Sequence, residues 1–362
     1  MQHQQYRPIW ATIDRSAIAH NFKRVKSFCP QAQVMAVVKA NGYGHGLLTA
    51  ASALKHATQV GLNSLDEVHQ LRAAGFNLPA NLFAPLITSK VLAYCANNQV
   101  RPAIFDHEHL KILAQMPKTG SLEVWLKVDT GMGRLGFAPS EVAEVLDQLK
   151  AIDAVDKIHL MSHLAQADSP DNKGNDTQLS TFQSFDALPG IEDRSLLNSA
   201  GVVSFSEQAY DWVRPGIMLY GISPTNGVSA TELGLVPAMT LYSRLISVKE
   251  VPKGHPIGYS GTFCAPEAMK VGIIAAGYGD GYPRLAPTGT PVWINDQIVP
   301  SIGRVSMDML AVDLRSMPNA KVGDVAQLWG ANNPIEGVAQ SVGTIAYELT
   351  CRVLERVEHQ VI

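Results

Sequence analysis

The sequence predicts a two-domain α/β protein, in which an N-terminal (β/α)8 barrel of the TIM type is followed by a mostly β C-terminal domain. A chain of 362 residues is longer than one ordinary domain. From about residue 30 to 221, short apolar runs alternate with amphipathic helical patterns, as in repeated βα units. After about residue 232, apolar runs are bounded by Gly, Pro, Asn and Asp, and no helical pattern intervenes before Ile335. We therefore expect a barrel over residues 12–232 and a β-rich domain over residues 233–362.

The barrel prediction rests on eight candidate strands. They are Val34–Lys39, Gln59–Asn63, Asn81–Ala84, Val100–Ile104, Glu123–Val128, Ile158–His163, Ser195–Asn198 and Val213–Gly216. Helical patterns between them include Leu47–Ala57, Leu65–Ala74, Ser140–Ile152 and Thr177–Leu188. Eight βα units over about 200 residues match a (β/α)8 barrel. The alternative is an open doubly wound sheet, but the spacing of Gly42, Gly44 and Gly46 after the first strand is not its dinucleotide fingerprint.

The segments on either side of the barrel complete the expected elements. Pro8–Ile13 is β-like and precedes a first helix, Ser16–Phe28. Whether this N-terminal strand (residues 1–11) joins the second domain stays open at this point. The candidate strands of the second domain are Met239–Val251, Met269–Ala276, Pro291–Ile294 and Leu310–Leu314, and a last helix, Val342–Val357, is expected to close the chain.

Composition and charge exclude several classes of protein. Charged residues make up 17% of the chain, below the roughly 25% of typical domains, which favours a large buried core. A net charge of −3 gives no broad basic field for nucleic acid or anionic lipid. No apolar run approaches the ~20 residues of a membrane span, and the N-terminus lacks a signal-peptide pattern. The four cysteines are scattered, so we expect no metal site, no disulfide framework and a cytoplasmic location.

Polar side chains gather where the predicted barrel strands end. These ends carry the catalytic groups in (β/α)8 barrels. They hold Lys39, Lys127 with Asp129, His163, Asn198 with Ser199, and Arg214. Lys39 follows the apolar run Val34–Val38, and a desolvated lysine has a lowered pKa and forms Schiff bases readily. The alternative is a lysine that reaches solvent at the barrel rim. The distribution over five strands predicts an active site at this end.

Eight segments of the chain resemble, in the same order, segments of alanine racemases. They are Ala36–Gly46, Trp125–Gly136, Met161–His163, Asn198–Ala200, Arg214–Gly221, Gly258–Gly261, Gly277–Arg284 and Gly303–Asp308. The resemblance covers nearly the whole chain, from about residue 8 to 350. It implies an enzyme that interconverts L-alanine and D-alanine, and so supplies or consumes D-alanine, a precursor of peptidoglycan.

The resemblance also implies a cofactor, pyridoxal 5'-phosphate, held as a Schiff base on Lys39. The other residues that match cofactor contacts of the family are Tyr43, Ser199, Gly216, Ile217 and Tyr347 at the phosphate, His163 and Asn198 beside the cofactor, and Arg214 at the pyridine nitrogen. A guanidinium has only donors, so the ring nitrogen facing Arg214 must be an unprotonated acceptor. Such a ring is a weaker electron sink than a pyridinium, which limits side reactions.

Racemisation removes a proton from one face of Cα and delivers another to the opposite face, which two bases achieve most simply. The resemblance assigns these roles to Lys39 and Tyr259. It assigns substrate contacts to Arg134, Met307 and Asp308, a carbamate-bearing lysine to Lys127, and an access channel to Asp168, Tyr278 and Arg284. It further implies a head-to-tail homodimer whose two active sites are each shared between subunits.

Two departures from the family pattern and three alternative functions accompany this assignment. Ser260 stands where the family usually has Gly, and Arg352–Arg356 departs from its usual Arg-Val-Pro-Arg ending. A barrel-type decarboxylase would pair the ring nitrogen with an acid and not with Arg214. A cofactor-carrying barrel without turnover would lack the second domain and Tyr259. A broad-specificity racemase for basic amino acids would carry an export signal and lack Lys127. Substrate breadth and a biosynthetic or catabolic role stay open.

Overall fold

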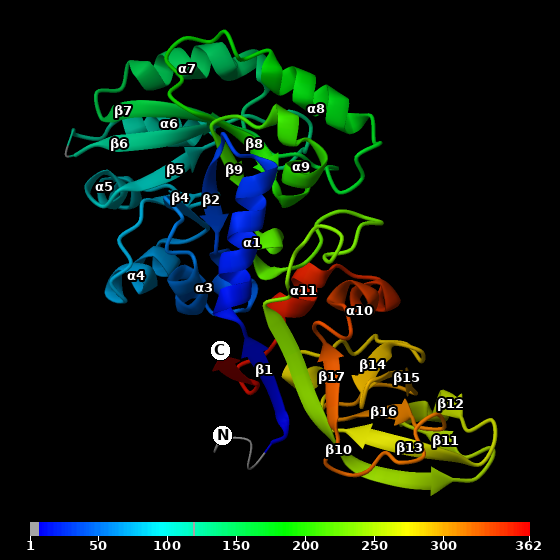
Figure 1. Ribbon diagram of the computed structural model, residues 1–362. Coiled ribbons are helices and arrows are strands. Elements are labelled where there is room, and N and C mark those ends of the chain that lie inside the picture. The colour runs from blue at the N-terminus through cyan, green and yellow to red at the C-terminus, as the bar shows by residue number, and fades with distance from the viewer. Residues whose placement is uncertain (1–6, 119) are drawn as a thin grey trace. The chain divides into compact units, whose positions relative to one another are not determined.

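The computed structural model describes residues 7–118 and 120–362, and the chain divides into two compact units. The barrel unit comprises Ala19–Leu219 and Ser223–Leu235. The β unit comprises the described residues up to Ile18 together with Tyr220–Ile222 and Val236–Ile362. Figure 1 shows the elements of both units. The first six residues of the chain, which belong to the N-terminal stretch considered above, lie outside the described residues.

The barrel unit contains a closed barrel of eight parallel strands, which confirms the predicted architecture. The strands are β2 (Gln33–Val37), β3 (Gln59–Leu62), β4 (Ala80–Leu82), β5 (Val100–Ile104), β6 (Leu122–Lys127), β7 (Val155–Met161), β8 (Arg194–Asn198) and β9 (Trp212–Arg214). The barrel closes where β2 pairs with β9, with Val34 opposite Val213. Large apolar side chains fill it, and one buried cluster joins Met35, Trp125 and Trp212 from three strands.

Helices follow most of the barrel strands and surround the barrel (Figure 1). They are α1 (Arg15–Phe28), α2 (Lys39–Tyr43), α3 (Leu47–Ala53), α4 (Leu65–Ala73), α5 (Ser89–Asn97), α6 (His107–Ala114), α7 (Val142–Lys150), α8 (Gly174–Gln183) and α9 (Ser199–Ser204). Single turns of 3₁₀ helix lie at η1 (Pro139–Glu141), η2 (Ser206–Gln208) and η3 (Ile217–Tyr220). Local sequence fixes several helix starts: Ser64 and Glu67 form a capping box before α4, and Thr88 caps α5.

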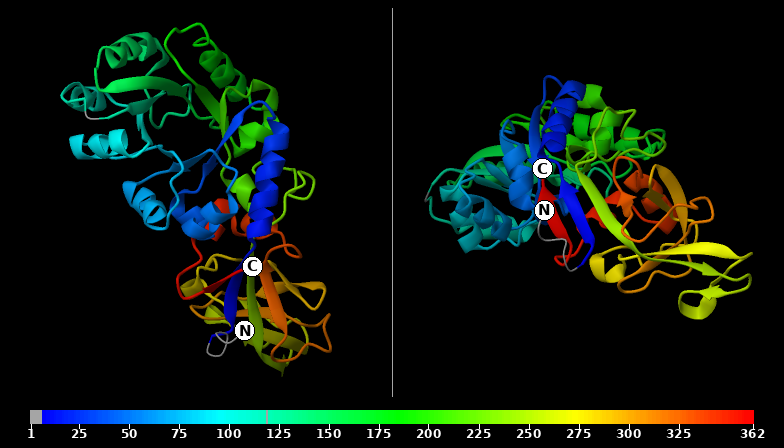
Figure 2. Two further views of the ribbon diagram at one scale, coloured as in Figure 1. Left: turned by 60° about the vertical axis from the view of Figure 1, so that its left-hand side comes forward. Right: turned by 60° about the horizontal axis from the view of Figure 1, so that its bottom comes forward.

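The β unit is built on one sheet in which strands distant in sequence are neighbours. Its order is β13 (Met269–Ile274), β16 (Leu310–Asp313), β15 (Gln297–Ile302), β14 (Pro291–Ile294), β17 (Val325–Trp329), β10 (Met239–Val251), β1 (Ile9–Ile13) and β18 (Glu358–Val361). β10 pairs with β17 along its first part and with β13 along its second part, and a bulge lies between Leu245 and Ser247. β1 therefore belongs to this unit, antiparallel to β10 and parallel to β18 (Figure 2).

Smaller elements complete the β unit. They are the hairpin β11 (Pro256–Ile257) and β12 (Phe263–Cys264), the 3₁₀ turns η4 (Tyr259–Gly261) and η5 (Tyr278–Asp280), and the helices α10 (Ile335–Val342) and α11 (Ala346–Cys351). The predicted closing helix Val342–Val357 is wrong. Gly343 ends α10 with φ +75°, a conformation that glycine adopts readily, and the chain finishes in β18. Among the described residues, no helix has both the length and the apolar character needed to cross a membrane.

Candidate active site

The sequence predicted that Lys39 ends a strand, but in the structure Lys39 begins a left-handed turn. β2 ends at Val37, two residues before Lys39. The four residues after Lys39, from Ala40 to Tyr43, all have φ between 52° and 61°. Non-glycine residues pay roughly 1–2 kcal/mol each for this conformation, so the turn needs support. Glu67 accepts a hydrogen bond from the N–H of Ala40 at 2.8 Å, and the Asn41 side chain accepts one from the N–H of Leu47 at 2.8 Å. These contacts fix the backbone that carries Lys39.

The environment of the Lys39 amine is partly aromatic. Its Nζ lies 5.9 Å from the ring centroid of Phe83, which follows β4. Phe83 in turn lies over Gly61 of β3, where an added Cβ would be 2.4 Å from the ring. Lys39 is partly buried, and its amine reaches the carboxyl end of the barrel beside an aromatic face.

Three of the residues matched to a phosphate site meet in the barrel unit. The buried Ser199 hydroxyl accepts a hydrogen bond from the N–H of Gly216 at 2.8 Å. A Cβ on residue 216 would lie 2.2 Å from the hydroxyl oxygen of Tyr43, so only glycine lets that phenol approach. Ile217, the next residue, is fully buried. Hydroxyls and backbone N–H groups are the donors that bind phosphate, so this set fits a phosphorylated cofactor. Tyr347 lies on α11 in the β unit and is half-buried there.

Arg214, the last residue of β9, is 5% exposed, and both of its terminal nitrogens have acceptors. It donates to the Ser195 hydroxyl at 2.5 Å and to the carbonyls of Ser162 and Leu196 at 2.5 Å and 3.2 Å. Burial lowers its pKa to about 10, so the guanidinium stays charged near neutral pH. A ring nitrogen placed against it can only accept. The sequence analysis did not identify Ser195 and Ser162 as partners of Arg214. The only sequence feature that could have indicated them is a serine next to apolar strand residues.

His163 lies two residues beyond the end of β7 and contacts two of the other matched residues. Its Nδ1 is 3.5 Å from Nη2 of Arg214, and its Nε2 is 3.4 Å from Nδ2 of Asn198. Burial, and then the positive charge of Arg214, lower the pKa of His163 well below its ordinary value. The imidazole is therefore neutral at physiological pH. Asn198 also caps α9 by accepting from the N–H of Gly201 at 2.9 Å, which fixes its side chain.

Lys127 ends β6 inside the same group of cations and is 7% exposed. Burial, followed by the charges of Arg214 and Arg134, lowers its pKa to about 7. Asp129 counters this shift, but its carboxylate accepts backbone N–H groups of Gly131, Met132 and Gly133 at 2.8–3.1 Å. The Lys127 amine therefore loses its proton far more readily than an ordinary lysine. Arg134, on the turn that Asp129 holds, is exposed.

The remaining matched residues lie outside the barrel ends. Asp168, in the barrel unit, accepts from the Asn226 side chain at 3.2 Å. Tyr259 is 66% exposed on η4, in the β unit. Ser260 beside it has φ +61°, the left-handed conformation for which the glycine usual in the family is suited, and its hydroxyl accepts from Arg304 at 3.4 Å. Sequence reasoning had missed Arg304.

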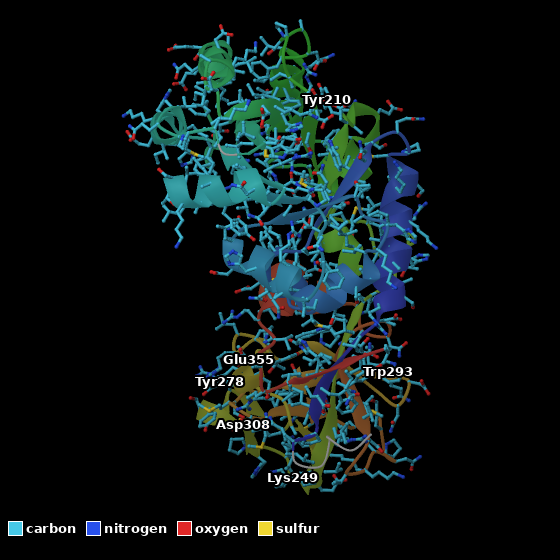
Figure 3. The ribbon with its side chains drawn as sticks, turned by 90° about the vertical axis from the view of Figure 1, so that its left-hand side faces the viewer. Tyr210, Lys249, Tyr278, Trp293, Asp308 and Glu355 are labelled. Atoms are coloured by element: carbon cyan, nitrogen blue, oxygen red, sulfur yellow. The ribbon has the colours of Figure 1, made fainter. Side chains whose placement is uncertain are left out.

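Two turns of the β unit bring together Tyr278, Met307 and Asp308. Figure 3 labels Tyr278 and Asp308, and the N–H of Tyr278 donates to the carbonyl of Ser306 at 3.1 Å. Met307 is exposed, and Arg356 forms an ion pair with Asp308 that lowers the pKa of this carboxyl. Arg284 is exposed on the segment after η5. Within residues 7–118 and 120–362, no three His, Cys, Asp or Glu side chains are placed to hold a metal ion.

This arrangement defines a class of protein. A (β/α)8 barrel that presents a lysine, a neutral histidine and a buried arginine at the carboxyl ends of its strands is a barrel enzyme with a cofactor-type site. The family model of the alanine racemase N-terminal domain matches residues 13–224, and that of the alanine racemase C-terminal domain matches residues 238–361. The chain belongs to the alanine racemase family.

Individual relatives agree with this assignment. The chain is 46% identical over 349 residues to an alanine racemase of Shewanella baltica, covering 96% of this chain and 97% of that protein. It is 45% identical over 348 residues to one of Nitrosococcus oceani, with the same coverage. Its fold matches the crystal structure of the biosynthetic alanine racemase from Pseudomonas aeruginosa with a TM-score of 0.94 and 40% identity, over 98% of this chain and 99% of that one.

Proposed function

We propose that this chain is an alanine racemase that binds pyridoxal 5'-phosphate through Lys39 and transfers protons to and from Cα of alanine. The observation that carries the proposal is that Lys39 lies just after β2 and the buried Arg214 ends β9, and these two parallel strands pair at the same end of one barrel. Family membership supports the reaction and the cofactor class. When bound, the cofactor supplies a carbonyl that condenses with amines and a ring that stabilises negative charge developing at Cα.

The residues around Lys39 have distinct tasks in this proposal. Tyr43, Ser199 and the backbone at Gly216 and Ile217 bind the phosphate, and Tyr347 is assigned to the same group by the family pattern. Arg214 stays charged, because its pKa of about 10 lies well above neutral pH, and would donate to the ring nitrogen of the bound cofactor. It would thereby keep that nitrogen unprotonated and restrict the chemistry to proton transfer. His163, neutral and in contact with Arg214, would lie beside the ring with Asn198.

Two bases on opposite faces of Cα carry out the proton transfer. With the cofactor bound, Lys39 would accept the Cα proton of D-alanine, and Tyr259 would accept that of L-alanine. Arg134 binds the substrate carboxylate, with Met307 and Asp308 as further substrate contacts. Asp168, Tyr278 and Arg284 line the access channel. Addition of carbon dioxide to the neutral amine of Lys127 forms an N–C bond and releases one proton to solvent, and the resulting carbamate anion would pair with Arg134 and hold it in position.

The active site is completed by a second copy of the chain in a head-to-tail homodimer. Lys39 belongs to the barrel unit and Tyr259 to the β unit, and the 66% exposure of Tyr259 leaves its phenol available to another subunit. Each site therefore uses Lys39 of one protomer and Tyr259 of the partner subunit. We also propose a cytoplasmic location, which fits the scattered spacing of the four cysteines along the chain.

Mixing two inactive variants tests the shared site. If sites are shared, subunit exchange between Lys39→Ala and Tyr259→Phe gives heterodimers in which one site carries both lesions and the other carries neither. Racemisation should then reappear at up to about half the wild-type rate per heterodimer. Mixing Lys39→Ala with Arg214→Ala is the control, because both lesions lie in the barrel unit and every site stays damaged. No recovery in the first mixture, despite demonstrated exchange, would refute sharing. Racemisation by the wild-type enzyme, measured on single amino acids, tests the reaction and its substrate breadth separately.

A further inference from the structure

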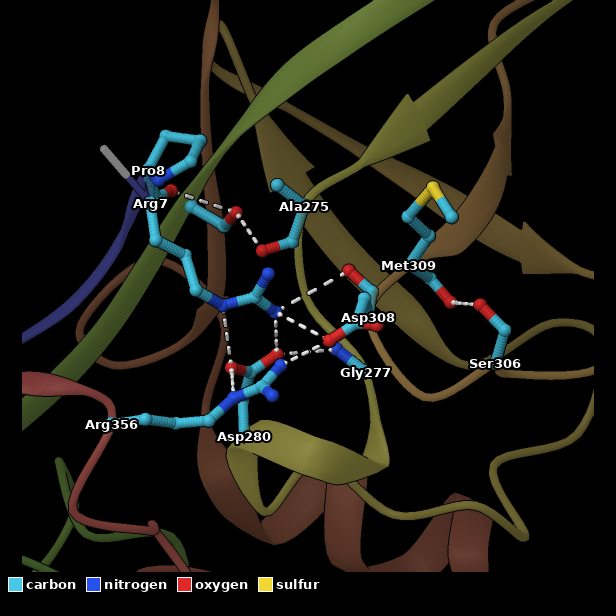
Figure 4. A network of polar contacts seen from close by, with 10 residues as sticks. Arg7, Pro8, Ala275, Gly277, Asp280, Ser306, Asp308, Met309 and Arg356 are labelled. Atoms are coloured by element: carbon cyan, nitrogen blue, oxygen red, sulfur yellow. Dashed lines mark hydrogen bonds and ion pairs between the residues drawn. The ribbon is translucent and has the colours of Figure 1, made fainter. Parts of the chain in front are cut away.

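A buried carboxylate lies at the centre of a polar network of the β unit (Figure 4). The side chain of Asp280, the last residue of η5, is 0% exposed. It accepts from Arg7 at 3.0 Å and 2.5 Å, from Nε of Arg356 at 2.7 Å and from the N–H of Gly277 at 2.9 Å. A buried charge is costly unless it is paired and hydrogen-bonded, and an apolar contact of similar volume often stabilises a fold equally well. The network therefore calls for an explanation beyond stability.

The same two arginines reach a second carboxylate. Arg356 donates from Nη2 to Asp308, and Arg7 approaches Asp308 at 3.6 Å. Two acids and two guanidiniums thus form one balanced cluster, and the four residues come from the N-terminus, η5, the segment before β16 and the segment before β18. If the Asp280 charge were removed, Asp308 would be the one carboxylate of this cluster left to pair with both guanidiniums.

Backbone contacts couple η5 to the segment that carries Met307 and Asp308. Tyr278 and Gly279 donate their N–H groups to the carbonyls of Ser306 and Met307 at 3.1 Å and 2.8 Å. A Cβ on Gly277 would lie 2.2 Å from the carbonyl oxygen of Ser306, so the two turns are in contact without a side chain between them. A shift of either turn therefore moves the other.

We propose that Asp280 is a positioning residue of the racemase, whose carboxylate fixes Tyr278, Met307 and Asp308 and thereby sets the affinity for alanine. The inference rests on the proposed function, which places those three residues at the access channel and the substrate. Asp280 takes no part in proton transfer, because its oxygens are occupied by two guanidiniums and a backbone N–H and it has no exposed surface. The turn with Tyr259 contacts residues Gly303 and Arg304, and the contacts of Asp280 and η5 are made to Ser306, Met307 and Asp308 through the backbone and the two arginines.

The test compares two buried, arginine-paired carboxylates of the same unit. Asp280→Asn keeps the shape and removes the charge. Asp313→Asn is the matched control, because Asp313 on β16 is 7% exposed and pairs with Arg315 at 2.7 Å, away from η5. We expect Asp280→Asn to raise KM for both alanine enantiomers about tenfold, the effect of losing one charge-assisted contact, with kcat within about twofold. Asp313→Asn should lower Tm and leave KM unchanged.

Variants of Arg356 provide an independent readout if Asp280→Asn does not fold. Arg356 is partly exposed, so its replacement disturbs the core less. Arg356→Gln should raise KM in the same way, and Arg356→Lys, which keeps the charge, should restore part of the affinity. A folded Asp280→Asn or Arg356→Gln enzyme with wild-type KM overturns the proposal, and so does an equal rise of KM in Asp313→Asn. A wild-type enzyme unable to racemise alanine would instead contradict the proposed function.

Discussion

Replacement of Lys127 by Met should abolish a carbamate and weaken substrate binding. Burial and the neighbouring charges of Arg214 and Arg134 lower the pKa of Lys127 to about 7, far below the 10.5 of an ordinary lysine. Since carbon dioxide reacts with the neutral amine, this shift makes Lys127 more reactive near neutral pH than an exposed lysine. Loss of the charge-assisted contact between this carbamate and Arg134 should lower kcat/KM roughly ten- to a hundredfold.

Carbon-13 NMR of the holoenzyme in ¹³C-bicarbonate measures the modification directly. We expect one carbamate signal in the wild-type enzyme and none in Lys127→Met. Lys157→Met is the control, because Lys157 is a half-exposed lysine paired with Glu192 at 3.4 Å and should leave the signal and the activity unchanged. Removal of carbon dioxide from the buffer should lower wild-type kcat/KM toward that of Lys127→Met. A wild-type enzyme without the signal, or a Lys127→Met enzyme with full activity, would refute the reasoning.

Three further predictions concern the cofactor site and stability. Gly216→Ala places a Cβ 2.2 Å from the Tyr43 hydroxyl, so titration of apoenzyme with pyridoxal phosphate should show at least about tenfold weaker binding, and unchanged binding would contradict the phosphate assignment. Burial alone would lower the pKa of His159, but Asp193 and Glu123 raise it. Protonated His159 therefore stabilises the folded protein fully below the pKa of about 6.5 that the imidazole has in the unfolded chain, and this stabilisation is lost as pH rises through its pKa in the folded protein. The Tm deficit of His159→Gln should therefore shrink as pH rises above about 6.5, and a deficit independent of pH would count against this. Ser260→Gly removes the conformational strain of a left-handed serine but also its contact with Arg304. The free energy of unfolding, measured by urea denaturation, should therefore fall by no more than about 1 kcal/mol, and a larger fall would mean that the Arg304 contact outweighs the strain.

Sequence periodicity located the barrel strands to within a few residues but not the backbone at their ends. The strand predicted to reach Lys39 stops at Val37, because the chain then enters a left-handed turn that Glu67 and Asn41 hold through side-chain contacts. The predicted closing helix ignored Gly343, whose positive φ separates α10 from α11. The strand β17 was missed, since its pairing partners β10 and β14 lie far away in the sequence. The strand β15 was also missed, although it forms a hairpin with the adjacent β14.

The sequence by itself determined the fold class, the order of its units and, through eight ordered segments, the family to which the chain belongs. These properties follow from periodicity and residue identity, which are local. Only the tertiary structure decided that Lys127 has a pKa of about 7, that His163 is neutral and that Asp280 joins two arginines. Charge states and buried networks depend on desolvation and on the distances between residues remote in sequence, and these quantities exist only once the chain has folded.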